Sequence, residues 1–222
     1  MRGLPRTGLA TDEPSLDPGP PGNILAGRSS VDAAAALAAQ LLRGDAERLA
    51  HSAAVARRAE ELSATVGAAE RDELVSAAWL HDIGYSPSIR QTGFHPVDGA
   101  RYLRRSGWPV AIQELVAHHS GSRFVARVRK LEPGLVEFSF REDELSDALT
   151  IADQTVGPGG RAMTVEERLA DMLRRHGPDS PNALAHAARQ PYLLAAARRV
   201  VARLRGRGLS PRELRILLAD RP

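Results

Sequence analysis

His81 and Asp82 stand next to each other in the sequence and offer an imidazole nitrogen and a carboxylate as neighbouring metal ligands. Further potential ligands precede and follow this pair, namely His51 before it and His95, His118, His119 and Asp153 after it. Five of the seven histidines fall between residues 51 and 119, each in or beside a segment that we predict to be helical. Together these side chains can complete a site for one or two divalent ions.

Three predicted helices carry histidines on apolar stripes. On a helix predicted over 45–66, the stripe consists of His51, Val55, Ala59, Leu62 and Val66. On a helix predicted over 71–83, it consists of Leu74, Ala77, Ala78 and His81. On a helix predicted from residue 109, it consists of Ile112, Leu115, Val116 and His119. His118 is rotated from its stripe by about 100°, so the spacing selects His119 and leaves His118 as a supporting or surface residue.

Each histidine also has a structural interpretation that involves no metal. His51 alone is equally consistent with a hydrogen-bonded core residue, and His81-Asp82 with a hydrogen bond that caps the helix before Gly84. His95 begins a helix predicted over 95–105 and is either a ligand or a cap. The ordered set of His and Asp residues favours metal binding, because a buried Asp beside a buried His needs a compensating charge.

The composition predicts an all-α protein. The chain has 222 residues, is 43% hydrophobic and only 4% aromatic, and is dominated by Ala and Leu. It lacks cysteine, which excludes disulfides and thiolate ligands and favours a cytoplasmic location. No apolar run is long enough to span a bilayer. The formal net charge of +3 rests on arginine, with Lys130 the only lysine, and this small excess does not indicate a nucleic-acid surface.

Three regions follow one another along the chain. Residues 1–30 contain five prolines and predict a disordered leader, residues 31–178 a helical domain, and residues 179–222 a C-terminal helical extension packed on it. Further helices are predicted over 32–43, through Leu145 to Asp153, from a Thr164/Glu167 capping box to His176, and near 181–205 and 210–219. Residues 133–141 alternate apolar and polar side chains, so a short strand is an alternative there.

Several arginines are candidates for binding an anionic substrate. Arg161 follows Gly157–Gly160, a loop whose amides could approach an anion, although a turn between helices explains these glycines as well. Arg123, like Arg90 and Arg101, lies near the candidate ligands in sequence. Guanidinium groups bind phosphate through paired hydrogen bonds, but each of these residues is equally consistent with a solvated surface arginine.

The ordered residues resemble the HD-domain superfamily of metal-dependent phosphohydrolases. The resemblance rests on His51, His81-Asp82 in AWLHDIGY and Asp153 in LTIADQT, and covers roughly residues 45–155. It implies an all-helical bundle whose central helices hold the metal, and phosphate-ester hydrolysis as the activity. His95 in HPVDGA and His119 in HHSG are similar to the six-ligand, binuclear branch.

Two groups within that superfamily share parts of this pattern. A bacterial group that acts on dinucleoside polyphosphates also carries an Ala-Asp followed by Pro and Arg, as Ala152-Asp153 and the segment 157–161 do here. The cyclic-dinucleotide phosphodiesterases share HDIG but have lysine where this chain has Tyr85, and a Gly-Tyr-Pro motif where Ser120-Gly121-Ser122 follows the histidine pair. These departures argue against a cyclic-dinucleotide substrate.

The resemblance implies one or two divalent ions, with Asp82 as the bridging carboxylate. His51, His81 and Asp153 would serve one ion and His95 and His119 the other, with Asp82 and His81 as the catalytic residues. Metal binding lowers the pKa of water from 15.7 to about 7 in favourable sites, which supplies a hydroxide to attack phosphorus. Nitrogen and oxygen ligands suit Mn, Fe, Co, Ni or Zn. We therefore expect a small phosphorylated substrate, such as a nucleotide.

Two other functions remain open on the sequence. The six-ligand order also resembles the HD-domain diiron oxygenases, which cleave carbon bonds with dioxygen. An HD fold that senses a nucleotide without turning it over is the other alternative, although the complete ligand set argues against it.

Overall fold

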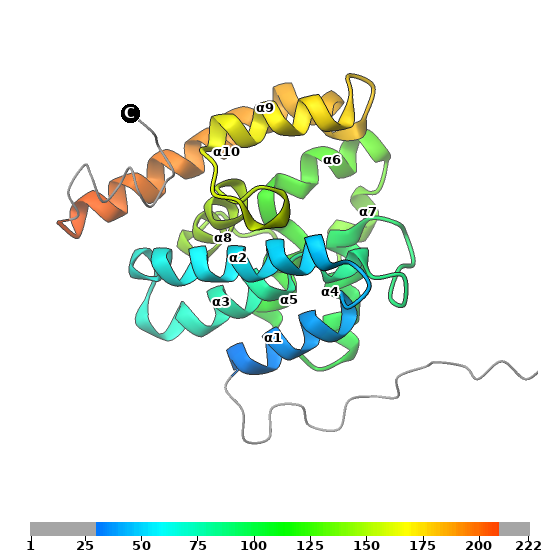
Figure 1. The fold of residues 1–222 in the computed structure, drawn as a ribbon, viewed down its shortest axis with the longest axis horizontal. Coiled ribbons are helices and arrows are strands. Elements are labelled where there is room, and N and C mark those ends of the chain that lie inside the picture. Colours follow the sequence, from blue (N-terminus) through cyan, green and yellow to red (C-terminus); the bar gives the residue numbers. More distant parts are fainter. Residues whose placement is uncertain (1–29, 209–222) are drawn as a thin grey trace, which may run out of the picture.

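The computed structural model describes residues 30–208, and this part of the chain is all-α (Figure 1). Its helices are α1 (Ser30–Leu41), α2 (Ala46–Leu62), α3 (Arg71–Leu80), α4 (His95–Arg105), α5 (Val110–His118), α6 (Ser122–Arg129), α7 (Glu132–Leu135), α8 (Glu144–Gln154), α9 (Val165–His176) and α10 (Pro181–Gly206). The leader predicted over 1–30 lies outside the described residues except for Ser30, and so does the helix predicted near 210–219.

The apolar stripes predicted for α2, α3 and α5 face the core. Val55, Ala59 and Leu62 of α2 are completely buried, as are Leu74 and Ala78 of α3. Burying such side chains removes apolar surface from water, which is the main force that packs helices together. Because the histidines share these stripes, the same packing turns them towards the centre of the molecule.

Two layers of helices enclose this core. Helices α2 and α3 lie side by side, with α1 packed against α3, while α9 and α10 cross the opposite side of the molecule (Figure 1). Helix α8 lies between the two layers and contacts both α2 and α10.

Helix α10 is fastened to α8 by a buried carboxylate. Arg199 and Arg203 of α10 each donate to Asp147 of α8 at 2.6 Å, and the Asp147 side chain is almost fully buried. Paired charges of this kind cost much less to bury than a single one. The two ion pairs therefore anchor the second half of α10 to the first turn of α8.

The strand alternative for residues 133–141 is wrong. Within residues 30–208 the only β pairing is an isolated bridge between Val156 and Ala162, so an alternating segment has no neighbouring strand. Residues 132–135 form α7 instead, with Pro133 in its first turn, where the missing amide hydrogen costs no helical hydrogen bond. Helix α6 was not predicted from the sequence.

Other predicted helices agree with the structure. The capping box is present at α9, where Thr164 accepts from the Glu167 amide at 3.0 Å and Glu167 accepts from the Thr164 amide at 2.9 Å. Helix α3 ends at Leu80, three residues earlier than predicted, and His81 is its C-cap. Within the described range, no helix has both the length and the apolar character that crossing a membrane requires.

Candidate metal centre

A close backbone contact brings His95 next to the His81-Asp82 turn. Gly84 lies in the 3₁₀ turn that follows α3, and a Cβ atom there would be only 2.0 Å from the backbone oxygen of His95. Only glycine permits this approach between the turn and the first residue of α4. The contact places the His95 ring against Tyr85, with the two rings stacked at 4.0 Å.

One group of potential ligands lies between α2, α3 and α8. It consists of His51, His81 and Asp153, all buried, with one donor atom of each within 4.8 Å of the others. The Nε2 atoms of His51 and His81 lie 3.1 and 3.9 Å from Oδ1 of Asp153. Two imidazoles and a carboxylate at such spacing form a nitrogen and oxygen donor set for a divalent ion.

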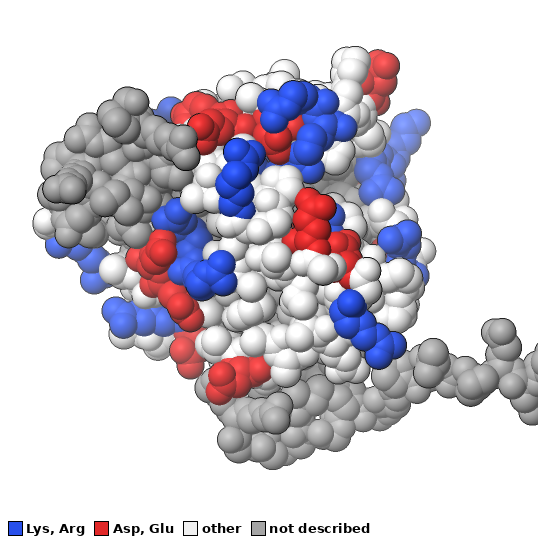
Figure 2. All heavy atoms as spheres, viewed as in Figure 1, with Lys and Arg blue, Asp and Glu red and all other residues white. Residues whose placement is uncertain are grey.

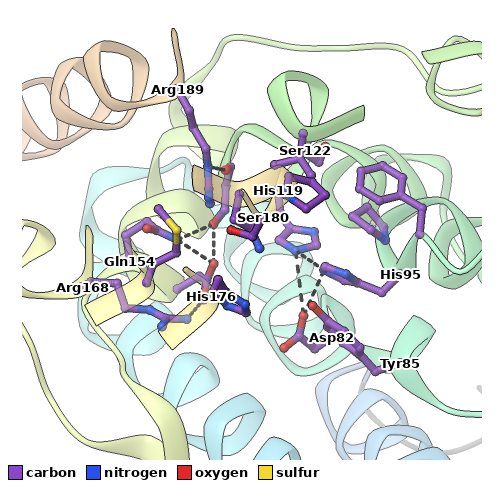
Figure 3. Close-up of a pocket in the computed structure, with 18 of the residues that line it drawn as sticks. Asp82, Tyr85, His95, His119, Ser122, Gln154, Arg168, His176, Ser180 and Arg189 are labelled. Atoms are coloured by element: carbon purple, nitrogen blue, oxygen red, sulfur yellow. Dashed lines mark hydrogen bonds and ion pairs between the residues drawn. The ribbon is translucent and has the colours of Figure 1, made fainter. Parts of the chain in front are cut away.

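A second group adjoins the first and consists of Asp82, His95 and His119. The Nε2 atoms of His95 and His119 lie 3.2 Å apart, and 3.3 and 4.0 Å from Oδ1 of Asp82. Figure 3 shows these three side chains converging on one side of the pocket.

Asp82 joins the two groups through its two carboxylate oxygens. Its Oδ1 faces His95 and His119, whereas its Oδ2 lies 3.5 Å from Nε2 of His81 and 4.0 Å from Nε2 of His51. A carboxylate in this position can offer one oxygen to each of two cations. The structure thus brings together all six residues expected to bind metal.

Backbone carbonyls hold three of the histidines by the nitrogen that faces away from the centre. The Nδ1 atoms of His51, His81 and His119 lie 3.1, 2.8 and 2.6 Å from the carbonyl oxygens of Gly157, Ala78 and Val116. A ring whose Nδ1 carries the donated hydrogen presents a lone pair at Nε2, as metal-binding histidines do.

The atom that fits a cation best is Nε2 of His81. His81 is 1% exposed, and its Nε2 is buried with no hydrogen-bond partner among the described residues. An unsatisfied buried polar atom costs about 1–3 kcal/mol, so such atoms are rare in folded proteins. A divalent ion would satisfy this nitrogen, and the residues present therefore fit the metal that the sequence implies.

Ser120 and Gln154 orient Asp153. The Ser120 hydroxyl and the Gln154 amide both donate to Oδ2 of Asp153, which leaves Oδ1 for His51 and His81. Ser120 reaches Asp153 because it has a left-handed backbone with φ of 50°, directly after His119. Sequence reasoning missed both residues, and no motif in the chain marks this turn.

The electrostatics of the centre favour the protonation states in which these side chains bind metal. Burial alone would raise the pKa of Asp82, but the surrounding histidines and Arg48 outweigh it and hold this pKa well below its usual range. Burial lowers the pKa of His119 to about 4, and repulsion by His81 acts in the same direction. Near neutral pH the centre therefore contains an ionised Asp82 and a neutral His119, which are the forms that bind metal.

The metal centre forms part of the wall of a cavity of about 270 Å³. This volume lies just below the range of small-molecule sites, which begins at about 300 Å³. Arg48 and Arg168 approach the ligand carboxylates from the cavity side, and Arg48 donates to Oδ2 of Asp82 at 2.6 Å. The other arginines of its wall are Arg129, Arg175 and Arg189.

The arginines singled out from the sequence do not line this cavity. Arg123 packs its guanidinium over the rings of Phe140 and Tyr192, 4.0 and 4.6 Å from their centroids. Arg161 is exposed and contacts the sulfur of Met163, while Arg90 and Arg101 contact the Tyr85 carbonyl and Glu137. The cavity arginines that sequence reasoning missed come from α2, α6, α9 and α10.

The glycine loop after α8 supports His51 instead of lining the cavity. The Gly157 carbonyl lies 3.1 Å from Nδ1 of His51, and a Cβ atom on Gly160 would lie 3.0 Å from the side chain of Ala54. The loop therefore packs closely on α2, and its amides are not part of the cavity wall.

His118 and His119 should behave differently when replaced by alanine. His118 points away from the centre, with its Nε2 2.9 Å from the Phe138 carbonyl. We expect His118→Ala to retain its metal and to lose about 1 kcal/mol of stability, the contribution of one hydrogen bond. We expect His119→Ala to lose most of the metal held by the second group. Metal analysis and thermal unfolding of both variants test this, and equal metal loss would refute the assignment.

The fold and the centre define a class: an all-helical protein with a buried cluster of His and Asp residues suited to divalent metal ions. The chain also matches the HD-domain family model over residues 48–221, more than half of its length. The protein belongs to the HD-domain family, whose members are generally metal-dependent phosphohydrolases. No curated protein and no solved structure matches the chain.

Proposed function

We propose that this protein is a metal-dependent phosphohydrolase that cleaves a phosphate ester or anhydride of a nucleotide or another small phosphorylated compound. The observation that carries this proposal is the position of Asp82, whose two oxygens face two separate groups of ligands. Divalent ions bound there would activate water as a nucleophile and neutralise charge on the phosphoryl oxygens. Asp82 and His81 are thus the proposed catalytic residues.

The charge of the cavity supports an anionic substrate. Arg48 lies at 2.6 Å from Asp82 and 3.6 Å above the Tyr85 ring, so its guanidinium is held at the edge of the metal centre. Arg168 lies 4.0 Å from Asp153 on the other side. Both groups can donate hydrogen bonds to phosphoryl oxygens without moving far, and positioned cations of this kind stabilise the charge that develops during phosphoryl transfer.

The size of the cavity and the outer surface favour a small molecule. On the face shown in Figure 2, basic and acidic side chains are interspersed and no continuous basic surface appears. A nucleic acid normally requires such a surface, since phosphate contacts dominate its affinity. Five arginines instead line the cavity beside the metal centre.

A panel assay tests the proposed function. The purified protein would be stripped of metal, loaded with Mn, Fe, Co, Ni or Zn in turn, and assayed for phosphate release from nucleotides and other phosphate esters. We expect release with at least one metal and none without metal. Oxygen consumption by the iron-loaded protein with an organic substrate, without phosphate release, would favour the oxygenase instead. Tight nucleotide binding without turnover in any metal would favour the sensing module.

A further inference from the structure

Helix α10 contributes an arginine to the cavity that the metal centre does not require. Arg189 lies on the third turn of α10 and lines the same cavity as His119 and Asp153. Its Nε donates to the Ser120 carbonyl at 2.7 Å, directly beside the turn that orients Asp153. Figure 3 shows Arg189 and Arg168 on one side of the pocket, and His95 and Tyr85 on the other.

The guanidinium of Arg189 has no carboxylate partner. Within residues 30–208 it forms no ion pair, and the Ser120 carbonyl is its only hydrogen-bond acceptor there. Burial lowers the pKa of Arg189; attraction by Asp153 opposes this shift, and repulsion by Arg168 adds to it. Arg189 is half-buried, and a cation held in a cavity without a hydrogen-bonded carboxylate indicates a ligand that supplies negative charge.

Arg168 is also left without a close counterion. In the part of the chain that the structure describes, its nearest acids are Asp171 and Asp153, at 3.9 and 4.0 Å, and its buried Nε has no hydrogen-bond partner. Asp171 already accepts from Arg174 and Arg175 at 2.6 and 2.7 Å, one on each oxygen. Asp153 lies within the first ligand group, where a metal would take its negative charge. Two guanidinium groups therefore face this end of the cavity, and within residues 30–208 neither is hydrogen-bonded to a carboxylate.

We propose that Arg168 and Arg189 form an oxyanion subsite that binds a phosphate group of the substrate beside the metal centre. Guanidinium forks match the geometry of phosphate, and two of them can hold one group by several charge-assisted hydrogen bonds. This inference rests on the proposed function and adds to it that α9 and α10 complete the substrate site. It also gives α10 a specific role, since Arg189 lies on the same helix as Arg199 and Arg203, which anchor α10 to Asp147.

Inorganic phosphate is the probe that tests this subsite. Isothermal titration calorimetry would measure its affinity for the manganese-loaded protein and for the chelator-treated protein. Because the subsite consists of arginines, we expect the chelator-treated protein to bind phosphate as well. We expect Arg189→Gln and Arg168→Gln to weaken this binding about ten- to hundredfold, the effect of losing a charge-assisted hydrogen bond.

Two further variants separate phosphate binding from a structural role of Arg189. Arg198→Gln is the matched control, since Arg198 is an exposed arginine of the same helix outside the cavity, and its affinity should stay within about twofold of wild type. Arg189→Lys keeps a charge and a donor for Ser120 and should recover part of the affinity. Circular dichroism and manganese content should be unchanged in all variants.

Three results would overturn the subsite. In the first, the chelator-treated wild-type protein binds no phosphate. In the second, the Arg189→Gln variant binds phosphate with wild-type affinity. In the third, the variant loses phosphate affinity together with its bound manganese, and Arg189→Lys does not recover the affinity. In the last case Arg189 acts only by holding Ser120. The measured phosphate affinity does not depend on turnover. Phosphate binding at the subsite without hydrolysis in any metal would therefore refute the proposed function and leave the subsite intact.

Discussion

Replacing Asp82 with alanine should remove the bound metal and abolish phosphate release. Among residues 30–208, Asp82 is the only one whose oxygens face both ligand groups, so its loss takes one donor from each. We expect kcat/KM to fall by at least about 10³-fold, which corresponds to about 4 kcal/mol of lost transition-state stabilisation. Metal analysis and the phosphate-release assay on the same preparations check both effects.

Two further variants serve as controls for this result. Asp72→Ala removes an exposed carboxylate from α3, the helix that leads to His81, and should leave metal content and activity unchanged. Asp82→Asn keeps the shape of the side chain and an acceptor for Arg48, so it should fold even if the alanine variant does not. If either Asp82 variant retained the full metal content, the assignment of the centre would be wrong.

Removing the metal from the wild-type protein should have the second largest effect. Chelation should abolish activity, and one equivalent or more of a suitable divalent ion should restore it. An ion present at 1,000 times its dissociation constant stabilises the folded state by about 4 kcal/mol. For a protein of this size that is a difference in Tm of about 8–16 °C between the loaded and stripped forms.

The stability difference should depend on the ligand groups. Scanning calorimetry with and without metal would show a much smaller shift for Asp82→Asn and an unchanged shift for Asp72→Ala. A wild-type protein whose Tm and activity are both unaffected by chelation would contradict a catalytic metal. The Nε2 of His81, which has no hydrogen-bond partner within residues 30–208, gives the structural reason to expect the shift, because metal binding removes the cost of burying this nitrogen unpaired.

The parts of the structure that depend on local pattern could be predicted from the sequence. Helical spacing predicted that His51 and His81 face the core, and it selected His119 over His118. The reason is physical: the apolar residues one and two turns away on the same stripe must be buried, and they carry the histidine with them. The capping box of α9 is equally local, since its two hydrogen bonds join residues three apart.

The parts that depend on long-range packing could not be predicted. Ser120 adopts a positive φ without being glycine, and it contacts Asp153, 33 residues away. Arg189 lies 69 residues from the Ser120 carbonyl that it contacts. Arg123 looked like a candidate because it is close in sequence to the histidine pair, but the neighbouring aromatic rings hold its guanidinium instead. Proximity in sequence is a poor guide to which charged side chains reach a cavity.

Anomalous diffraction from crystals of the metal-loaded protein, recorded at the absorption edge of the metal, tests the central claim most directly. We expect two peaks on either side of Asp82, one among His51, His81 and Asp153 and the other beside His95 and His119. A single peak that does not contact Asp82, or no peak at the centre in a protein that releases phosphate, would contradict the account.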